Sequence, residues 1–421
     1  MYRTNGYYFF LQSILTFLLL LVVCSTIAGT YTHSQYQKKD SISLSSQKEK
    51  IPSINIKYTS KGWQFSTADE KYVLQFQSRL QFRYATPQDT DPLTFDDFQQ
   101  DEHAVLKVNR ARLKIGGNAF EKWLKYFWEY ELASGNLLDF RLMIEKCSFF
   151  KFKAGQWKAH YNRERVISSG KQQMADRSLI NRPFTIDRQQ GISFYGNYAG
   201  RGKLNFSYWF SILTGTGRGS TTNDDNHLMY MSRIQWDIFG RVLGFEGSDI
   251  KFHKYPAGLI ALAAVTNRSP YTRFSQAGGG QLEGFEEGQA GQYRVNQFLV
   301  ETAFMYSGFS WQQEFHWKEI DDKINQTITS LIGNYLQFGY FFHYAMQWVP
   351  RQLEIAFRYS IYNPNRSQLE NLREEFSLDV NWFFKNHLNK LTTEISYFSF
   401  QEKIEDVYDG WRFRIQWDVS I

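Results

Sequence analysis

The sequence predicts an all-β protein, a 16-stranded antiparallel transmembrane β-barrel. Apolar and polar residues alternate with a period of two along most of the chain beyond residue 70, as they do in strands with two different faces. The apolar face is rich in aromatic residues, which make up 18% of the 421 residues, and aromatic girdles are typical of membrane barrels. No helical segments are available to cover that face. A closed sheet in lipid is then the arrangement that satisfies every backbone hydrogen bond.

The last eleven residues show the alternation most clearly. One face carries Trp411, Phe413, Ile415, Trp417, Val419 and Ile421. The other face carries Arg412, Arg414, Gln416, Asp418 and Ser420. A strand with an aromatic outer face and a charged inner face fits the wall of a water-filled barrel.

The N-terminus has the pattern of an export signal. Arg3 precedes a mostly apolar run over residues 9–23, and small residues follow at Ser25, Ala28 and Gly29. We expect a signal peptide at residues 1–29, with an uncleaved membrane anchor as the alternative. Residues 30–65, rich in Ser, Gln and Lys at their start, are expected to form a periplasmic linker. Residues 66–421 are expected to form the barrel.

Sixteen alternating segments follow the linker, most of them near the length that a tilted membrane strand needs, about 9–11 residues. In chain order they are residues 71–84, 104–117, 123–133, 137–147, 150–158, 191–199, 203–213, 228–239, 257–267, 292–305, 308–318, 334–346, 352–362, 374–384, 390–401 and 410–421.

The connections between these segments alternate between long and short. We expect long external loops at 85–103, 159–190, 214–227, 268–291, 319–333 and 363–373. We expect tight turns at 118–122, 200–202, 306–307, 347–351 and 385–389. Short periplasmic turns and long outer loops are typical of outer-membrane barrels. Two connections break the pattern, because 134–136 is short where an external loop is due and 240–256 is long where a periplasmic turn is due.

The inward faces of three neighbouring strands are basic. The first, second and sixteenth strands together contribute Arg79, Arg83, Arg110, Arg112, Lys114, Arg412 and Arg414. Such a strip attracts anions. The third and fourth strands place Glu129, Glu131, Asp139 and Glu145 on the same face. A transverse field, with cations on one wall and anions on another, fits these residues as well as an anion path does.

The loop over residues 159–190 is the second candidate for function, since structureless loops this long are usually functional. It carries six cations and three carboxylates. We expect Arg163, Arg165 and Lys171 to face the aqueous path. We expect the three carboxylates, Glu164, Asp176 and Asp187, to pin the loop to the wall by ion pairs. In a 16-stranded barrel this third extracellular loop is expected to fold inward and narrow the channel.

Several motifs resemble the phosphate-selective porin O and P family, and most closely its Bacteroidetes-type members. They are Gly62-Trp-Gln-Phe65, Leu74–Tyr84, Asn109–Gly117, Gly155-Gln156 with Asn162-Arg-Glu-Arg165, Asp176-Arg-Ser178 and Asp187-Arg188. The resemblance implies a 16-stranded, often trimeric, outer-membrane channel that passes phosphate or polyphosphate along arginines and a loop lysine. The family usually has proline where His160 stands here.

The sequence therefore predicts an outer-membrane porin of a Gram-negative bacterium that gives passive diffusion of small anions. A general or sugar-type diffusion porin is the alternative. None of the eight histidines lies in a recognisable catalytic or metal-binding motif, so we expect no enzyme, no cofactor and no metal site. The net charge of +6 is mild for this length and requires no nucleic-acid partner. The expected partners are small anionic solutes, outer-membrane lipid and two further copies of the chain in a homotrimer.

Overall fold

The computed structural model describes residues 53–99, 103–220, 222–275, 279–368, 370–401 and 407–421. The predicted signal peptide, most of the predicted linker, parts of four connections and the whole connection at residues 402–406 lie outside these ranges. No helix among the described residues is long and apolar enough to cross a membrane.

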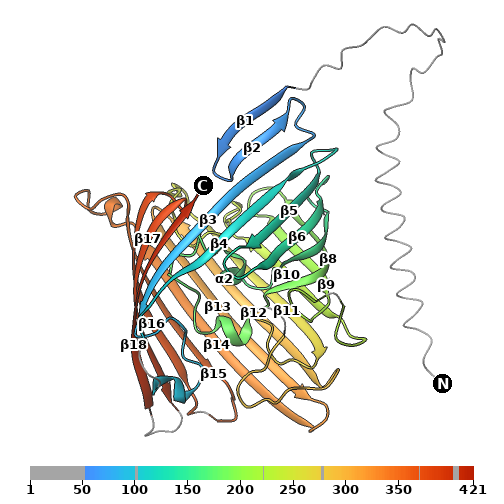
Figure 1. Ribbon diagram of the computed structural model, residues 1–421, viewed down its shortest axis with the longest axis vertical. Helices are drawn as coiled ribbons and strands as arrows, with labels where there is room; N and C mark the ends of the chain where they lie inside the picture. The colour runs from blue at the N-terminus through green and yellow to red at the C-terminus, as the bar shows by residue number, and fades with distance from the viewer. Residues whose placement is uncertain (1–52, 100–102, 221, 276–278, 369, 402–406) are drawn as a thin grey trace, which may run out of the picture. The chain divides into compact units, whose positions relative to one another are not determined.

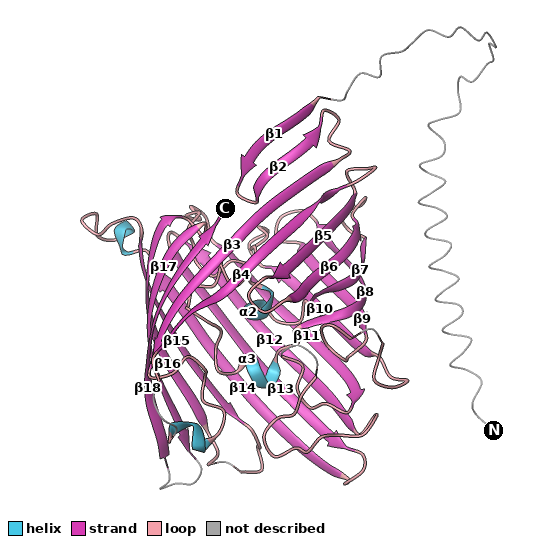
Figure 2. Ribbon diagram, in the orientation of Figure 1, coloured by secondary structure: helices cyan, strands magenta, loops and turns pink. Residues whose placement is uncertain are grey.

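Sixteen antiparallel strands, β3 to β18, form a closed barrel, as the sequence predicts (Figures 1 and 2). They are β3 (Val73–Thr86), β4 (Val105–Asn118), β5 (Leu124–Glu131), β6 (Asn136–Ile144), β7 (Lys151–Lys158), β8 (Arg188–Ala199), β9 (Asn205–Leu213), β10 (Met229–Asp237), β11 (Ala257–Ser269), β12 (Tyr293–Tyr306), β13 (Phe309–Asp322), β14 (Thr327–Tyr340), β15 (Leu353–Asn363), β16 (Arg373–Lys385), β17 (Asn389–Gln401) and β18 (Val407–Ser420). Each strand pairs with the next in sequence, and β18 pairs with β3 through Phe413↔Thr86 to Ser420↔Arg79.

The two faces of the wall differ as the alternation requires. On β18, Trp411 and Trp417 are 65% and 45% exposed, whereas Arg412 and Arg414 are buried. On β3, Phe82 is exposed and Arg83 is buried. The exposed face is thus apolar and aromatic, and the polar face points into the barrel. This is the arrangement of a barrel surrounded by lipid.

A β-bulge shifts the alternation on β4. Gln81 pairs with Arg110 and Phe82 pairs with Val108, so that Asn109 is the extra residue on β4. Because of the bulge, Lys107 and Arg110 lie on the same side of the wall although they are three positions apart. Lys107 forms an ion pair with Asp89 at 2.5 Å. Strict alternation in the sequence does not anticipate an inward Lys107.

One turn and one strand differ from the sequence prediction. The predicted long loop over 319–333 is wrong, because β13 and β14 continue to a tight turn at residues 323–326. Asp322 Oδ1 accepts hydrogen bonds from the amides of Ile324 and Asn325, which stabilises this turn. The predicted strand over 334–346 is accordingly displaced to 327–340, and a short 3₁₀ helix, η2 (Phe342–Tyr344), follows it.

A β-hairpin stands where the sequence analysis expects linker. Strands β1 (Ile54–Thr59) and β2 (Gly62–Thr67) pair with each other, and β2 also pairs with β3. Gly62 has φ +85°, and a Cβ atom there would lie 2.1 Å from the Phe76 carbonyl oxygen, so the turn requires glycine. The hairpin extends the wall beyond the rim at the end of the barrel where β18 finishes (Figure 1). The linker prediction for residues 30–65 did not include these strands.

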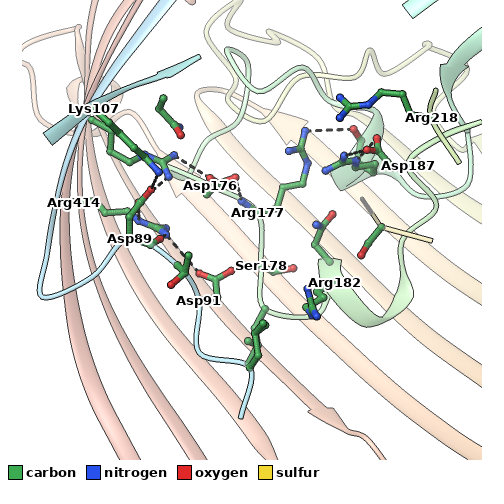
Figure 3. A pocket seen from close by; sticks show the side chains of 18 residues that line it. Asp89, Asp91, Lys107, Asp176, Arg177, Ser178, Arg182, Asp187, Arg218 and Arg414 are labelled. Atoms are coloured by element: carbon green, nitrogen blue, oxygen red, sulfur yellow. Dashed lines mark hydrogen bonds and ion pairs between the residues drawn. The ribbon is translucent and has the colours of Figure 1, made fainter. Parts of the chain in front are cut away.

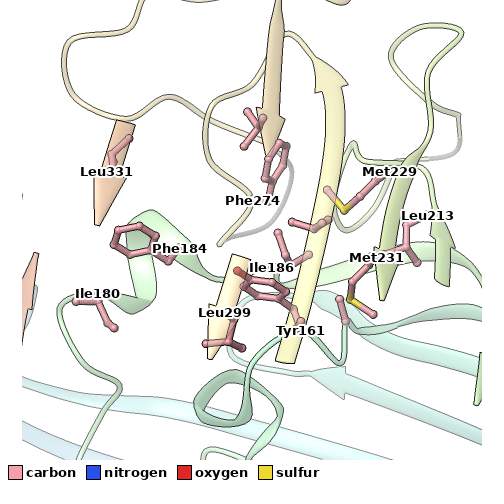
Figure 4. Packing of buried hydrophobic residues seen from close by; sticks show 14 of the residues in the cluster. Tyr161, Ile180, Phe184, Ile186, Leu213, Met229, Met231, Phe274, Leu299 and Leu331 are labelled. Atoms are coloured by element: carbon pink, nitrogen blue, oxygen red, sulfur yellow. The ribbon is translucent and has the colours of Figure 1, made fainter. Parts of the chain in front are cut away.

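The barrel contains a hydrophobic core as well as polar groups. Tyr161, Ile180, Phe184 and Ile186, all from the segment between β7 and β8, pack against inward side chains of the strands beyond them (Figure 4). The wall contributes Leu213, Met229, Met231, Leu299 and Leu331 to this cluster. This segment therefore fills part of the barrel with apolar packing, as a small domain core would.

Candidate functional site

The segment between β7 and β8, residues 159–187, is held against the inward faces of the strands by side chains from the wall. Two very short helices, α2 (Arg163–Val166) and α3 (Asn181–Phe184), interrupt it. Wall side chains, mostly from β12 to β17, bond many of its backbone amides and carbonyls, and short local turns bond others. Buried polar backbone groups need such partners.

Carboxylates of the wall accept several of these bonds. Glu301 accepts from the Arg163 amide at 2.9 Å, and Glu314 accepts from the Glu164 amide at 2.7 Å. Asp379 accepts from the amide of Ala175 at 2.8 Å. Glu375 and Glu354 accept in the same way from Leu179 and the Gln173 side chain, both at 2.7 Å. The acidic side of the barrel interior is therefore occupied by the segment and is not open to solutes.

Carbonyl oxygens of the segment face lysine and amide donors of the wall. Lys390 Nζ donates to the Gln172 carbonyl and Lys318 Nζ to the Pro183 carbonyl, both at 2.8 Å. Asn381 Nδ2 donates to the Gln173 carbonyl at 2.8 Å. Together with the carboxylates, these groups bond the segment to β12, β13, β15, β16 and β17, so its path is set by many separate wall residues.

A cavity of about 610 Å³ lies on the loop side of this segment, toward the long connections, and we call it the loop-end cavity (Figure 3). Its charged lining consists of Arg83, Lys107, Arg165, Arg177, Arg182, Arg218, Arg414, Asp89, Asp91, Asp176 and Asp187. Seven cations against four carboxylates leave a surplus of three positive charges. Arg182 and Arg218 point into this cavity in Figure 3, and no ion pair is found for either among the described residues.

The carboxylates of the loop-end cavity are bound by arginines of the wall. Asp89 lies 3.0 Å from Arg83 Nη1 and 2.9 Å from Arg414 Nε. Burial acts to raise the pKa of Asp89, but Arg83 and Arg414 outweigh it and lower that pKa. Asp176 lies 3.0 Å from Arg83 Nη2 and 3.5 Å from Arg110, and these two cations likewise hold its pKa well below the usual range against the effect of burial. These carboxylates stay ionised and fix the arginines in place.

A second cavity of about 540 Å³ lies at the opposite end, where β18 finishes, and we call it the terminus-end cavity. Its charged lining consists of Lys61, Arg79, Lys114, Lys171, Lys251 and Glu246. The segment over residues 159–187 contributes to both cavities, with Lys171 here and Asp176 to Asp187 at the loop end. Arg79 and Arg83 of one strand face likewise line different cavities.

The predicted site residues divide into three groups. Arg83, Arg165 and Arg414 line the loop-end cavity, and Arg79, Lys114 and Lys171 line the terminus-end cavity. Arg110, Arg112 and Arg412 belong to the same inward strip, where Arg112 binds Glu129 and Glu131 and Arg412 binds Asp91. Arg163 is different, because it is fully buried and its Nη2 donates to the carbonyls of Gly244 and Glu246. The expectation that Arg163 faces the aqueous path is wrong.

Most of the basic strip is neutralised locally. Arg79 lies 2.5 Å from Asp418 on β18 and donates to Ser169 Oγ at 2.8 Å. The acidic residues expected on the third and fourth strands are paired too, with Glu129 and Asp139 bound by Arg188 and Glu145 by Lys125. Truncating one partner of a buried pair leaves the other charge uncompensated, so these arginines are structural as well as electrostatic.

Sequence reasoning missed Lys107, Arg177, Arg182 and Arg218 as lining residues of the loop-end cavity. Lys107 is turned inward by the β4 bulge. Arg177 and Arg182 lie in the loop over residues 159–190, as do the three cations that the sequence predicts to face the aqueous path. Arg218 belongs to the next connection, residues 214–228, and no pattern in the sequence marks it. Among the described residues, no group of three or more His, Cys, Asp or Glu side chains could hold a metal ion.

The expected pinning of the loop to the wall is found for Asp176, which binds Arg83 of β3 at 3.0 Å. Asp187 lies 2.5 Å from Arg165 of the same loop and 3.6 Å from its chain neighbour Arg188. Glu164 instead accepts hydrogen bonds from the Ser178 amide at 2.6 Å and from its hydroxyl at 2.8 Å. Burial, together with the neighbouring Glu314, raises the pKa of Glu164 to about 7 from its ordinary value of 4.5.

This raised pKa gives a stability prediction. Between pH 4.5 and about 7 the folded protein keeps a proton on Glu164 that the unfolded chain has lost, so the free energy of unfolding falls as pH rises through this window. The slope reaches up to about 1.4 kcal/mol per pH unit. We expect Glu164→Gln to flatten this part of the profile, measured as heat-induced loss of the folded band at pH 4.5, 6 and 7.5. An unchanged slope would show that other groups cause it.

Comparison with known proteins supports the assignment of this barrel wall. The sequence model of a family described as phosphate-selective porin O and P matches residues 76–399. No curated protein matches the chain. The anion-selective porin from Comamonas acidovorans has a similar fold, with a TM-score of 0.51 at 11% identity, 83% of this chain and 99% of that one being covered.

Two further solved structures share the fold. The trimer form of OmpT from Vibrio cholerae gives a TM-score of 0.51 at 11% identity over 83% of this chain and 99% of that one. OmpF from Salmonella typhi, in a complex with daunomycin, gives 0.51 at 9% identity over 84% and 99%. At these identities the likeness concerns the fold alone.

Proposed function

The chain is a member of the phosphate-selective porin O and P family and is located in the outer membrane; on this basis we propose that it is a channel for the passive diffusion of small anions, with phosphate or polyphosphate as the leading solutes. The observation that carries this proposal is the surplus of cations in both cavities on either side of residues 159–187. Cavities lined by one sign of charge raise the local concentration of the opposite ion.

Residues 159–187 act, in this proposal, as an inward-folded third loop that narrows the channel and sets its selectivity. The carboxylates of β12, β13, β15 and β16 bind the loop, and residues of the basic strip on β3, β4 and β18 line the cavities on either side of it. In this proposal an anion passes from Arg182 and Arg218 toward Lys171, and cations line both cavities along its way. The acidic residues of the transverse-field alternative, Glu129, Glu131, Asp139 and Glu145, are instead paired with Arg112, Arg188 and Lys125.

A general or sugar-type porin is the second candidate. Sites that bind neutral organic ligands are lined mainly by apolar and aromatic side chains. The residues that line the loop-end cavity include no aromatic one, and those of the terminus-end cavity include Phe127 alone. The inward aromatic residues Tyr161 and Phe184 are packed in the hydrophobic core instead. The lining thus favours ions over sugars.

The proposed assembly is a homotrimer, which the trimeric neighbour supports. Its lipid partner is that of the outer membrane, around the exposed aromatic face. A channel needs no catalytic group, and the fold and family indicate a channel rather than an enzyme.

Ion selectivity of the purified protein tests the proposal. In a planar bilayer under a KCl gradient, we expect a reversal potential that reports chloride passing more readily than potassium. Added phosphate is expected to block the chloride current, because both ions compete for the same cations. Cation preference, or no preference, would exclude the anion channel. Anion preference without phosphate block would leave a channel for small anions in general.

A further inference from the structure

The connection between β10 and β11, residues 238–256, is the longest at the terminus end of the barrel. The other connections at this end are residues 119–123, 145–150, 200–204, 307–308, 341–352 and 386–388. A tight turn suffices to join two antiparallel strands, and connections much longer than that usually have a function. Its residues Leu243, Ser248 and Asp249 are buried, so the middle of the connection is packed against the rest of the protein.

This turn meets residues 159–187 inside the barrel. The Gly247 amide donates to the Lys171 carbonyl at 3.0 Å, and a Cβ atom on Gly247 would lie 2.7 Å from the Gln173 amide nitrogen. Ser248 Oγ donates to Glu354 on β15 at 2.8 Å, which also binds Gln173. Two segments from opposite ends of the barrel are thus joined by short backbone contacts.

Glu246 lies at this junction and faces the terminus-end cavity. Its Oε1 atom is 2.8 Å from Lys171 Nζ and 3.1 Å from Lys251 Nζ. It is the sole carboxylate among the residues that line this cavity, against five cations. Burial acts to raise the pKa of Glu246, but Lys171 and Lys251 outweigh it and lower the pKa to about 2. The carboxylate is therefore charged at neutral pH.

Both lysine partners remain accessible to solutes. The Lys171 side chain is 44% exposed and that of Lys251 is 71% exposed, whereas Glu246 is 18% exposed. Ion pairs of exposed lysines are weak, contributing about 0.2–1 kcal/mol, because water and salt screen them. A permeating anion can therefore displace the carboxylate from a lysine at little cost.

On the basis of the proposed anion channel, we propose that Glu246 is a selectivity-tuning residue, a tethered carboxylate that competes with the permeating anion for Lys171 and Lys251. An anion that arrives at Lys171 replaces Glu246, and the carboxylate takes the lysine back when the anion leaves. Conduction requires sites that bind strongly enough to admit an ion and weakly enough to release it. Glu246 supplies the second condition at the terminus end.

Glu246→Gln tests this role, since glutamine keeps the shape and removes the charge. In planar bilayers we expect the phosphate concentration that blocks half of the chloride current to fall about two- to fivefold, the range that an exposed ion pair provides. The anion preference in a KCl gradient should increase as well. In a Lys171→Gln background the effect of Glu246→Gln should shrink. Lys251→Gln, at an exposed side chain, should shift the block the opposite way.

Glu121→Gln is the matched control. Glu121 pairs with Lys71 at 3.0 Å, also at the terminus end, but it lies outside the cavity lining, and its variant should behave as the wild type. An anion-selective wild type with an unchanged Glu246→Gln would overturn the inference alone. A large rise in conductance with a loss of selectivity would make Glu246 a latch of the turn, which also overturns it. A wild type without anion preference would instead overturn the proposed function.

Discussion

Replacing Phe184 by alanine is expected to release residues 159–187 from the inner wall and to raise the single-channel conductance. Phe184 is completely buried, stacks on His316 at a centroid distance of 5.3 Å and packs edge-on against Tyr362. Removing a buried phenylalanine costs about 3–5 kcal/mol. The backbone hydrogen bonds of the loop depend on this packing for their register, so the loss falls on the loop and leaves the sixteen-strand ladder intact.

Conductance recordings of single channels, with circular dichroism to verify the barrel, measure this effect. Phe338→Ala is the matched control. Phe338 lies on the outward face of β14 and is 37% exposed, so its substitution removes the same atoms without touching the loop. It should leave conductance unchanged. Unchanged conductance in Phe184→Ala would mean that the loop keeps its place through hydrogen bonds alone.

The same release can be produced from the wall. A Cβ atom on Gly333 of β14 would lie 2.5 Å from Cε2 of Phe184, so Gly333→Ala forces the ring to move. We expect Gly333→Ala to resemble Phe184→Ala in conductance, with a smaller effect. Agreement of two variants on separate elements would assign the effect to their contact.

Reversing two charges in the loop-end cavity is the second prediction with a large effect. Arg182→Glu with Arg218→Glu changes its lining from a surplus of three cations to a surplus of one carboxylate. Neither arginine has an ion pair among the described residues, so the change removes charge that faces solutes and leaves no carboxylate stranded. We expect the reversal potential in a KCl gradient to move from anion preference to weak cation preference, and phosphate block to weaken strongly.

The control carries the same four-unit change in charge outside both cavities. Arg201 and Arg241 are exposed in turns at the terminus end, and Arg201→Glu with Arg241→Glu should shift the reversal potential little, because salt screens charges beyond about 10 Å. Equal shifts in both double variants would mean that net charge, and not the cavity, determines selectivity.

The sequence determined the wall of this protein. Because side chains of a strand alternate strictly, residues 411–421 disclose which of them face lipid and which face the interior, and all sixteen strands follow from the same rule. The closure of β18 on β3 also follows from strand order alone, whereas the register that brings Arg79 to Asp418 does not. The prediction failed where the alternation is broken, as by the bulge at Asn109, and where a strand begins with mostly polar residues, as in Thr327–Ser330.

The interior was decided by the tertiary structure. The loop over residues 159–187 has almost no regular secondary structure, so its path depends on partners distant in sequence, such as Glu301, Asp379 and Lys390. No local pattern reveals that Arg163 is buried under a turn 80 residues later, or that Glu246 of that turn binds Lys171. Periodicity reports the local face of a strand, whereas the pairing of charges inside the barrel depends on contacts between segments from opposite ends.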